Sequence, residues 1–442
     1  MPLLAARRPR RCALRAIPWA LLALALPAPA ATASAQSYTS VGGTSRDAIS
    51  RSASVDPPEA RAIWVSRFEY GSASGIARIM AAAARANFNI VYFQVRGAAD
   101  AYYRSDIEPC AVLLCGRLGG TPPYDPLEVA VREAHRYGLE LHAWLNALPG
   151  FPAGIGRACH SLGESDPLRP RHLLLEHPEY IMRDRSGRAL PCPNSEEYLW
   201  LSPGYGEVRS RLARVAADIA RRYAVDGIHL DRIRYPGPAW SYDYASLNAF
   251  GGEPARDPDA WTEFRASLIN ATVRETYDSI IAARADLVLS AATWGVYADR
   301  WGWRTQSGAR QLFQDPVTWA REGYLDVAVP MTYFRIKPSY CSRVDWACLL
   351  DDHVSLIQRG TGRHVYIGID ASKGAAEALR QIELARSRGA AGISIFSFTA
   401  ADSVGLLRLL ERDHFSRPAP VPTMPWRALV SRDSLTTGTR HR

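Results

Sequence analysis

The sequence lacks several motifs that would place it in a common functional class. No Gly-x-Gly-x-x-Gly or Walker-type loop follows any of its apolar segments, which argues against a nucleotide-binding sheet. It has no Cys-x-x-Cys pair and no His-x-His at the end of an apolar segment, so ligand spacings typical of metal centres are missing. The net charge of +9 comes from the two ends of the chain, because residues 59–415 are formally neutral. A neutral central region disfavours a nucleic-acid partner, whose binding depends on neutralising phosphates.

The first 35 residues predict a secretory signal peptide. Five arginines precede an apolar stretch, residues 16–31, that three prolines interrupt, and Ala33-Ser34-Ala35 follows as a small-residue cleavage site. The stretch is too short and too rich in proline for a stable membrane span, although a retained anchor is the alternative. We therefore predict an exported protein, periplasmic or extracellular, with no membrane span after signal removal. Residues 36–58, rich in Ser, Thr and Gly, predict a flexible leader.

The cysteines predict local disulfide bonds. Of the seven, Cys12 lies in the predicted signal peptide, which leaves six in the mature chain. An even number of cysteines in an exported protein suggests disulfides. Six cysteines allow 15 pairings, and we favour the pairing in which each loop is closed on itself. The predicted pairs are Cys110–Cys115, Cys159–Cys192 and Cys341–Cys348.

Eight short apolar segments alternate with helix-like stretches between residues 59 and 415. Several are apolar at nearly every position, which is typical of parallel strands covered on both faces. A doubly wound sheet usually has fewer strands, so the pattern predicts an α/β fold of the (β/α)8 TIM-barrel class with long βα loops. The Pro-rich tail, residues 416–442, predicts an extended, exposed and disordered appendage. The predicted strands are Ala62–Val65, Ile90–Val95, Leu139–Leu145, Gly227–Asp231, Leu287–Thr293, Leu325–Tyr333, Val365–Ile369 and Gly392–Phe398.

Polar and aromatic side chains gather at the ends of these strands, where a TIM barrel places its active site. Asp231 ends the run Gly227-Ile228-His229-Leu230-Asp231 and is the first candidate, with an ion pair to a nearby arginine as the structural alternative. His142 and His229 are core histidines in one interpretation and, with Asp231, metal ligands in another. Other residues at the strand ends are Arg67, Glu69, Gln94, Arg96, Asp100, Trp144, Asn146, Thr293, Trp294, Met331, Tyr333, Asp370, Phe396 and Ser397.

Aromatic residues crowd two of the predicted loops. Trp294, Tyr297, Trp301 and Trp303 follow the fifth strand, and residues 240–244 after the fourth strand contain Trp240, Tyr242 and Tyr244. Flat rings of this kind stack against sugar rings in glycan-binding clefts. The alternative is packing between long loops, in which aromatic side chains also dominate.

Several segments that follow one another in the family's order along residues 59–402 resemble the glycosyl hydrolase-like family 10 proteins. They include 60–65 (ARAIWV), 93–96 (FQVR), 142–146 (HAWLN), 226–231 (DGIHLD) and 330–333 (PMTY). The resemblance implies a TIM barrel in exported bacterial proteins that act on polysaccharides, including, in some members, the glycan strands of peptidoglycan. The sequence departs from the family pattern at Arg232, where many members carry a second acid, and at Ala147, which replaces a proline. A distant likeness to family 18 chitinases fails at Ile233, where those enzymes have a catalytic glutamate.

We therefore predict a glycoside hydrolase that uses two carboxyl groups, the usual requirement of this reaction. Asp231 is one of the two, and Asp100 is the favoured partner, with Glu69 next and Asp370 also on the same face. Gln94, Arg96, His142, Trp144, Asn146, His229, Trp294, Tyr333 and Asp370 are the predicted substrate-binding residues. The predicted partner is a polysaccharide, and no cofactor is expected. A non-catalytic glycan-binding protein and a metal-dependent hydrolase are the alternatives.

Overall fold

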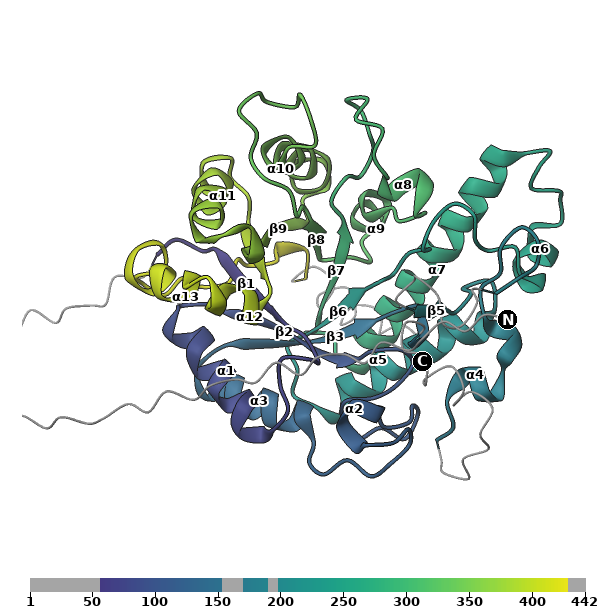
Figure 1. The fold of residues 1–442 in the computed structure, drawn as a ribbon, viewed down its shortest axis with the longest axis horizontal. Coiled ribbons are helices and arrows are strands. Elements are labelled where there is room, and N and C mark those ends of the chain that lie inside the picture. The colour runs from purple at the N-terminus through teal and green to yellow at the C-terminus, as the bar shows by residue number, and fades with distance from the viewer. Residues whose placement is uncertain (1–55, 153–169, 190–197, 428–442) are drawn as a thin grey trace, which may run out of the picture. The chain divides into compact units, whose positions relative to one another are not determined.

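A computed structural model describes residues 56–152, 170–189 and 198–427, which cluster as one compact unit. The predicted signal peptide, most of the predicted leader and the Cys159–Cys192 pair lie outside the described residues. Within the unit, eight parallel strands close into a barrel, in the order β1-β10-β9-β8-β7-β6-β3-β2 (Figure 1). The predicted TIM-barrel class is therefore confirmed. The barrel strands are β1 (Ala60–Val65), β2 (Ile90–Arg96), β3 (Glu140–Asn146), β6 (Gly227–Asp231), β7 (Val288–Trp294), β8 (Val327–Met331), β9 (His364–Asp370) and β10 (Gly392–Phe396).

The strands form where the sequence is apolar on both faces, because one face lines the barrel and the other packs against helices. Inside the barrel, Trp64, Tyr92, Trp144, Val329 and Tyr366 belong to one buried cluster. The helices cover the outside of the strands (Figure 1). They are α1 (Ala73–Arg85), α3 (Pro126–Arg136), α5 (Gly206–Arg222), α7 (Pro258–Ala283), α9 (Pro316–Arg321), α10 (Trp346–His353), which continues as η3 (Val354–Arg359), and α11 (Ala375–Ser387).

Several helices begin directly after a short polar side chain that caps their first turn. A proline or an apolar run follows this capping residue. The side chain of Asp125 accepts hydrogen bonds from the amides of Leu127 and Glu128 at the start of α3. Proline occupies the first turn of α3, α7 and α9, where the missing N–H has no intrahelical partner to lose. These caps set the lengths of the loops that precede the helices and so help to fix the barrel mouth.

The long loops contain short elements that the sequence analysis did not predict. The loop after β3 includes an antiparallel pair, β4 (Pro149–Pro152) and β5 (Tyr198–Trp200). After β10 the chain forms three short helical segments, α12 (Phe398–Ser403), α13 (Leu406–Leu409) and η5 (Leu410–His414). The other short elements are α2 (Val112–Cys115), α4 (Leu173–Glu176), η2 (Pro178–Tyr180), α6 (Tyr244–Phe250), α8 (Gly308–Gln311) and η4 (Ala371–Lys373).

Part of the Pro-rich tail lies against the N-terminal ends of the strands rather than extending from the barrel as predicted. The amide of Glu59 donates to the carbonyl of Pro420, and His364 Nε2 contacts the carbonyl of Thr423 at 2.9 Å. Val421 and Met424 pack against the cluster inside the barrel. Residues 416–427 therefore close the base of the barrel, opposite the C-terminal ends of the strands. The expectation of an appendage failed for this segment because it depended on proline content alone.

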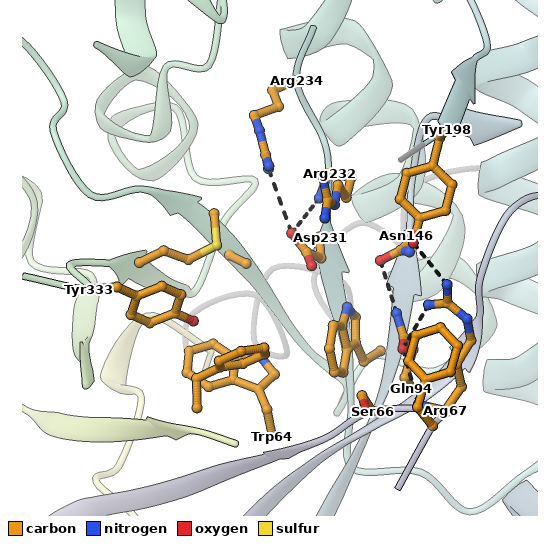
Figure 2. Close-up of a pocket in the computed structure, with 15 residues that line it drawn as sticks. Trp64, Ser66, Arg67, Gln94, Asn146, Tyr198, Asp231, Arg232, Arg234 and Tyr333 are labelled. Carbon is orange, nitrogen blue, oxygen red and sulfur yellow. Dashed lines mark hydrogen bonds and ion pairs between the residues drawn. The ribbon is translucent and has the colours of Figure 1, made fainter. Parts of the chain in front are cut away.

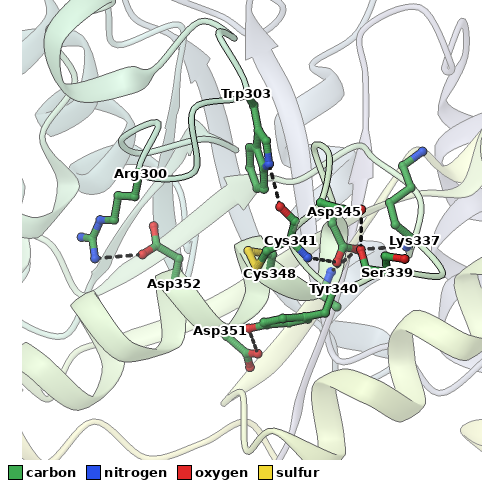
Figure 3. Close-up of a disulfide and its surroundings, with 12 residues drawn as sticks. Arg300, Trp303, Lys337, Ser339, Tyr340, Cys341, Asp345, Cys348, Asp351 and Asp352 are labelled. Carbon is green, nitrogen blue, oxygen red and sulfur yellow. Dashed lines mark hydrogen bonds and ion pairs between the residues drawn. A yellow bond between two sulfur atoms is a disulfide. The ribbon is translucent and has the colours of Figure 1, made fainter.

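The structure contains two of the predicted disulfides, Cys110–Cys115 and Cys341–Cys348. The second closes the loop before α10, where Asp345 accepts hydrogen bonds from the amides of Lys337 and Cys341 (Figure 3). Trp303 Nε1 donates to the carbonyl of Cys341 from a neighbouring loop. The disulfide therefore joins a network that fixes two loops at the mouth of the barrel. In the part of the chain that the structure describes, no helix is long and apolar enough to cross a bilayer.

Candidate active site

A cavity of about 340 Å³ opens at the C-terminal ends of the barrel strands, the location of active sites in TIM-barrel enzymes. Its walls come from seven of the eight barrel strands or the residues just after them, together with β5. Figure 2 shows these side chains around a central space. The lining residues are Trp64, Ser66, Arg67, Phe68, Gln94, Trp144, Asn146, Tyr198, Asp231, Arg232, Arg234, Ala292, Met331, Tyr333 and Phe396.

Among the described residues that line this cavity, one has an acidic side chain, Asp231. One of its carboxylate oxygens, Oδ1, accepts a 2.6 Å hydrogen bond from the amide of Arg232 and lies 3.7 Å from Nη1 of Arg234. Arg232 adopts a left-handed backbone conformation with φ of 52°, which costs a non-glycine residue about 1–2 kcal/mol. Buried Ile233 anchors the next position, and its carbonyl accepts a hydrogen bond from Gln314. The turn after β6 is thus held in a strained form that keeps Asp231 at the cavity.

A belt of hydrogen-bonded polar side chains forms the wall beside Asp231. Gln94 Nε2 donates to Asn146 Oδ1 at 3.1 Å, and Gln94 Oε1 accepts from the Arg67 guanidinium at 3.0 Å. Arg67 also donates to the Tyr198 hydroxyl at 2.8 Å, and Asn146 Nδ2 donates to the carbonyl of Gly97 at 2.9 Å. Since each amide orientation is fixed by a neighbour, the belt presents a rigid polar surface to any ligand.

Aromatic rings form the floor and the opposite wall. Trp64 Nε1 donates to His229 Nε2 at 3.0 Å, and His229 Nδ1 lies 2.8 Å from Ser290 Oγ. Burial, and then the nearby His142, keeps the pKa of His229 well below its usual value, so the ring is neutral and can accept the Trp64 hydrogen bond. Tyr333 stacks on Phe396 with ring centroids 5.3 Å apart, and its hydroxyl faces the same space as Asp231 in Figure 2.

Burial raises the pKa of Tyr333 well above its usual value, and the charges of Asp231 and Asp370 raise it further. The hydroxyl is therefore protonated and available as a hydrogen-bond donor. Trp144 Nε1 is buried and has no hydrogen-bond partner among the described residues. Buried donors without partners are costly, and those at a cavity wall are commonly satisfied by a ligand or water. The wall therefore combines flat apolar rings with donor groups, a combination suited to carbohydrate rings and their hydroxyls.

Comparison with known proteins assigns the chain to a family. The family model described as Glycosyl hydrolase-like 10 matches residues 59–382, most of the chain. The chain belongs to the glycosyl hydrolase-like 10 family. This confirms the resemblance seen in the sequence.

Two bacterial relatives carry the same type of name. Glycosyl hydrolase YngK of Bacillus subtilis (strain 168) is 26% identical over 407 residues, which cover 83% of this chain and 74% of that protein. Glycosyl hydrolase DigH of Escherichia coli (strain K12) is 28% identical over 291 residues, which cover 64% of this chain and 62% of DigH. The chain therefore matches less than two thirds of the length of DigH.

Solved structures share the fold of this family member. The PgaB (BpsB) glycoside hydrolase domain from Bordetella bronchiseptica superposes with a TM-score of 0.59 at 14% identity, covering 80% of this chain and 99% of that one. The catalytic domain of β-amylase from Paenibacillus polymyxa superposes with a TM-score of 0.52 at 14% identity, covering 78% of this chain and 94% of that one. At such low identity these similarities establish the barrel fold alone.

Five of the predicted site residues of this family member meet at the cavity: Asp231, Gln94, Trp144, Asn146 and Tyr333. The three acids considered as partners for Asp231 are absent from its described lining. Asp100 Oδ1 accepts hydrogen bonds from the amides of Gly97 and Ala98, at 3.2 and 2.8 Å. Glu69 accepts from Ser66, Ser397 and Thr399, which ties the loop after β1 to the loop after β10. Asp370 pairs with Lys373 at 3.2 Å.

The remaining predicted binding residues have structural contacts elsewhere. Arg96 is buried and pairs with buried Glu108 at 2.7 Å, beneath the cavity wall. His142 lies near the start of β3, where the absence of a side chain on Gly227 makes room for its ring, because a Cβ there would lie 2.5 Å from His142 Nδ1. His229 supports the floor from below without lining the cavity. Trp294 donates to the carbonyl of Gln306 and stacks with Arg234.

The aromatic loops pack against neighbouring structure. Trp301 stacks on Trp303 at 4.3 Å, and Tyr297 donates to Asp315. None of the loop aromatics at residues 240–244 or 294–303 is among the described residues that line the cavity. Packing between loops, the alternative interpretation, is therefore what the structure shows for these aromatic residues except Tyr244, which is 77% exposed.

Several lining residues of this glycosyl hydrolase-like protein were not predicted as site residues. Trp64 stands inside a segment that carried the family resemblance, so its position was a usable signal, and Arg67 was placed at the end of the first strand without a role in the site. Tyr198 lies on β5, and no periodic pattern marks this short strand. With respect to metals, the described ranges contain no group of three or more His, Cys, Asp or Glu side chains that could hold an ion.

Proposed function

We propose that the chain is a glycoside hydrolase that cleaves a polysaccharide at the barrel mouth, with Asp231 as the acid/base group. The observation that carries the proposal is the position of Asp231, whose carboxylate shares a cavity with stacked rings and a rigid polar belt. Family membership and the relatives named glycosyl hydrolases support the same reaction class.

Glycoside hydrolysis normally uses two carboxyl groups, one on each side of the scissile bond. The described lining supplies one carboxyl group. The carboxylates of Asp100 and Glu69 lie outside that lining and accept hydrogen bonds from backbone amides and, for Glu69, from the Ser397 hydroxyl. Some glycosidases take the second group from the substrate, whose 2-acetamido oxygen attacks the anomeric carbon. We propose this substrate-assisted route, which makes amino-sugar polymers such as peptidoglycan glycan strands the first substrates to test.

In this route protonated Asp231 gives its proton to the glycosidic oxygen as the bond from that oxygen to the anomeric carbon breaks. The acetamido oxygen forms a bond to the same carbon, which gives a cyclic oxazolinium intermediate. Ionised Asp231 then takes a proton from a water molecule, whose oxygen attacks the anomeric carbon and reopens the ring. In this proposal Tyr333, Asn146 and Gln94, which line the same cavity, hold the sugar hydroxyls during both steps.

The test compares three variants on peptide-free glycan strands, with new reducing ends as the measurement. Asp231→Asn removes the acid/base group, and we expect kcat to fall by at least about 100-fold. Asp100→Asn and Glu69→Gln are matched controls, for which we expect activity within a few-fold of the parent. Full activity of Asp231→Asn would refute the proposal. Loss of activity in a control variant that remains folded would return that acid to the mechanism.

The role of the acetamido group has its own test. Strands that are chemically N-deacetylated keep the backbone linkage but lose the internal nucleophile. We expect cleavage of these strands to fall by a factor similar to the Asp231→Asn effect. Equal rates on both polymers would require a protein carboxylate as the second group.

A non-catalytic glycan-binding protein is the second candidate, favoured by the single acid in the described lining. Retention of glycan strands by the parent chain without new reducing ends would identify it.

We also propose that the protein acts outside the cytoplasm. The signal-like residues 1–35 and the two disulfides of the described ranges support this location, since disulfides persist in oxidising compartments. Mass spectrometry of the mature protein from fractionated cells tests it, with cleavage after Ala35 as the expected result. Recovery of the full-length chain in the cytoplasm would contradict it.

A further inference from the structure

Among the described residues that line the cavity, most of the charged side chains are cationic. Arg67, Arg232 and Arg234 contribute three guanidinium groups, and Asp231 contributes the carboxylate among the described lining residues. A concave site with an excess of one charge concentrates ligands of the opposite charge. Guanidinium groups also match carboxylates geometrically, because two N–H groups can donate in parallel. The cavity is therefore suited to a sugar that carries a negative charge.

Two of the three arginines are nearly buried within the wall. Arg67 is 7% exposed and donates to both Gln94 and Tyr198, so it holds the polar belt in place. Arg234 is also 7% exposed, lies 3.7 Å from Asp231 and stacks with the Trp294 ring. Both side chains thus position other groups of the site.

Arg232 is the most exposed of the three arginines. It directly follows Asp231, is only partly buried, and its guanidinium carbon lies 5.2 Å from the centre of the Tyr198 ring. Its backbone is left-handed, its amide donates a hydrogen bond to the Asp231 carboxylate, and its side chain lies next to the acid/base group (Figure 2). Conformations of this kind persist where the surroundings enforce them, and they cluster at ligand-binding sites. Arg232 is thus the cation best placed to contact a substituent of the sugar bound at Asp231.

We propose that Arg232 is a specificity-determining residue that binds a carboxylate carried by the substrate sugar. This inference rests on the proposed hydrolase function and narrows its substrate to acidic polysaccharides. The carboxylate can belong to the sugar ring, as in a uronic acid, or to an ether-linked acid side chain, as on the muramic acid of peptidoglycan strands. Both sources offer the same planar anion to the guanidinium.

The experiment measures kcat/KM on peptide-free glycan strands and on the same strands after carbodiimide-mediated amidation of their carboxylates. We expect amidation to lower kcat/KM of the parent protein by at least tenfold. Arg232→Gln should lose most activity on the acidic strands and show nearly equal rates on both polymers, and Arg232→Lys should recover part of the preference. Arg310→Gln is the matched control, because Arg310 pairs with exposed Asp259 outside the cavity and should keep the parental preference. Circular dichroism confirms that each variant is folded.

A polyuronate tested beside the strands identifies the source of the carboxylate. Cleavage or retention of the polyuronate alone would indicate a ring carboxylate, and preference for the strands would indicate the ether-linked acid. Equal parental rates on acidic and amidated strands, or an unchanged preference in Arg232→Gln, would overturn the role of Arg232 and leave the hydrolase proposal intact.

A binding measurement separates this inference from the hydrolase proposal. Affinity electrophoresis of Asp231→Asn with acidic or amidated strands needs no cleavage. Selective retention of Asp231→Asn by acidic strands that an added Arg232→Gln change abolishes would support the role of Arg232, and if the parent protein also released no new reducing ends, the hydrolase proposal would be refuted while the role of Arg232 stood. Equal retention by both polymers would refute the role of Arg232.

Discussion

His353 in α10 is a fully buried histidine, and it links the stability of the barrel to pH. Its Nε2 contacts the carbonyl of Gly295 at 2.8 Å, and burial lowers its pKa from 6.5 to about 4. Between these two values the unfolded chain binds a proton at this position and the folded chain does not. Stability should therefore fall as the pH drops from about 6.5 towards 4, by up to about 1.4 kcal/mol per pH unit and about 3 kcal/mol in total.

Urea unfolding at pH 7, 6, 5 and 4.5 measures this slope. The variant His353→Gln keeps a side-chain donor for Gly295 and removes the titration, so its unfolding free energy should depend less steeply on pH than that of the parent. His177→Gln, at a histidine whose side chain is 43% exposed, serves as the control and should keep the parental slope. Identical slopes in all three proteins would contradict the assignment to His353.

At the residue scale, the candidate site shows how far the type of a residue and its position along a strand predict its place in the site. Asp231 could be predicted because it ends an apolar strand, and the end of a barrel strand faces the mouth. Asp100 has the same residue type and follows β2 closely, but its carboxylate turns back to the amides of Gly97 and Ala98. That orientation depends on the course of a loop, on which sequence periodicity gives no information.

At the scale of elements, the disulfide Cys341–Cys348 closes a short loop around the start of α10. Removing both sulfurs in Cys341→Ser/Cys348→Ser should lower the free energy of unfolding by about 2 kcal/mol, the entropic effect expected for so small a ring. Urea unfolding without reductant measures it. The network of Asp345 and Trp303 in Figure 3 should keep the native loop, so activity at 25 °C should persist. An unchanged free energy of unfolding would show that this network alone fixes the loop.

The barrel strands were predictable as elements because their burial on both faces leaves long apolar runs in the sequence. The predicted Gly227–Asp231 matches β6 at both ends. The pair β4 and β5 was not predictable, since each is only three or four residues long and their pairing joins positions about 50 residues apart. Such pairing is decided by tertiary packing, which overrides local preference in short strands. Tyr198, a lining residue on β5, was missed for the same reason.

At the scale of the whole barrel, the candidate site and residues 416–427 lie at opposite ends. The cavity opens at the C-terminal ends of the strands, and residues 416–427 cover the N-terminal ends. Buried Asp326 anchors this segment, because it accepts hydrogen bonds from Trp426 Nε1 at 2.8 Å and from Arg427 Nε at 3.1 Å. Arg363 also lies beside Asp326, at 3.4 Å. Stability and catalysis should therefore respond separately to changes at the two ends.

Truncation of the chain after Phe415 tests this separation. It removes two donors from a fully buried carboxylate, each worth about 1.5–3 kcal/mol, so the free energy of unfolding should fall by at least about 3 kcal/mol. The milder variant Arg427→Met should show roughly half of this loss, while Arg412→Met, at an exposed pair with Asp413, should leave stability within about 0.5 kcal/mol of the parent. At 15 °C, where the truncated chain should still fold, kcat/KM should stay within a few-fold of the parent because no cavity residue has moved. A folded truncated protein without activity would show that the base and the mouth of the barrel are coupled.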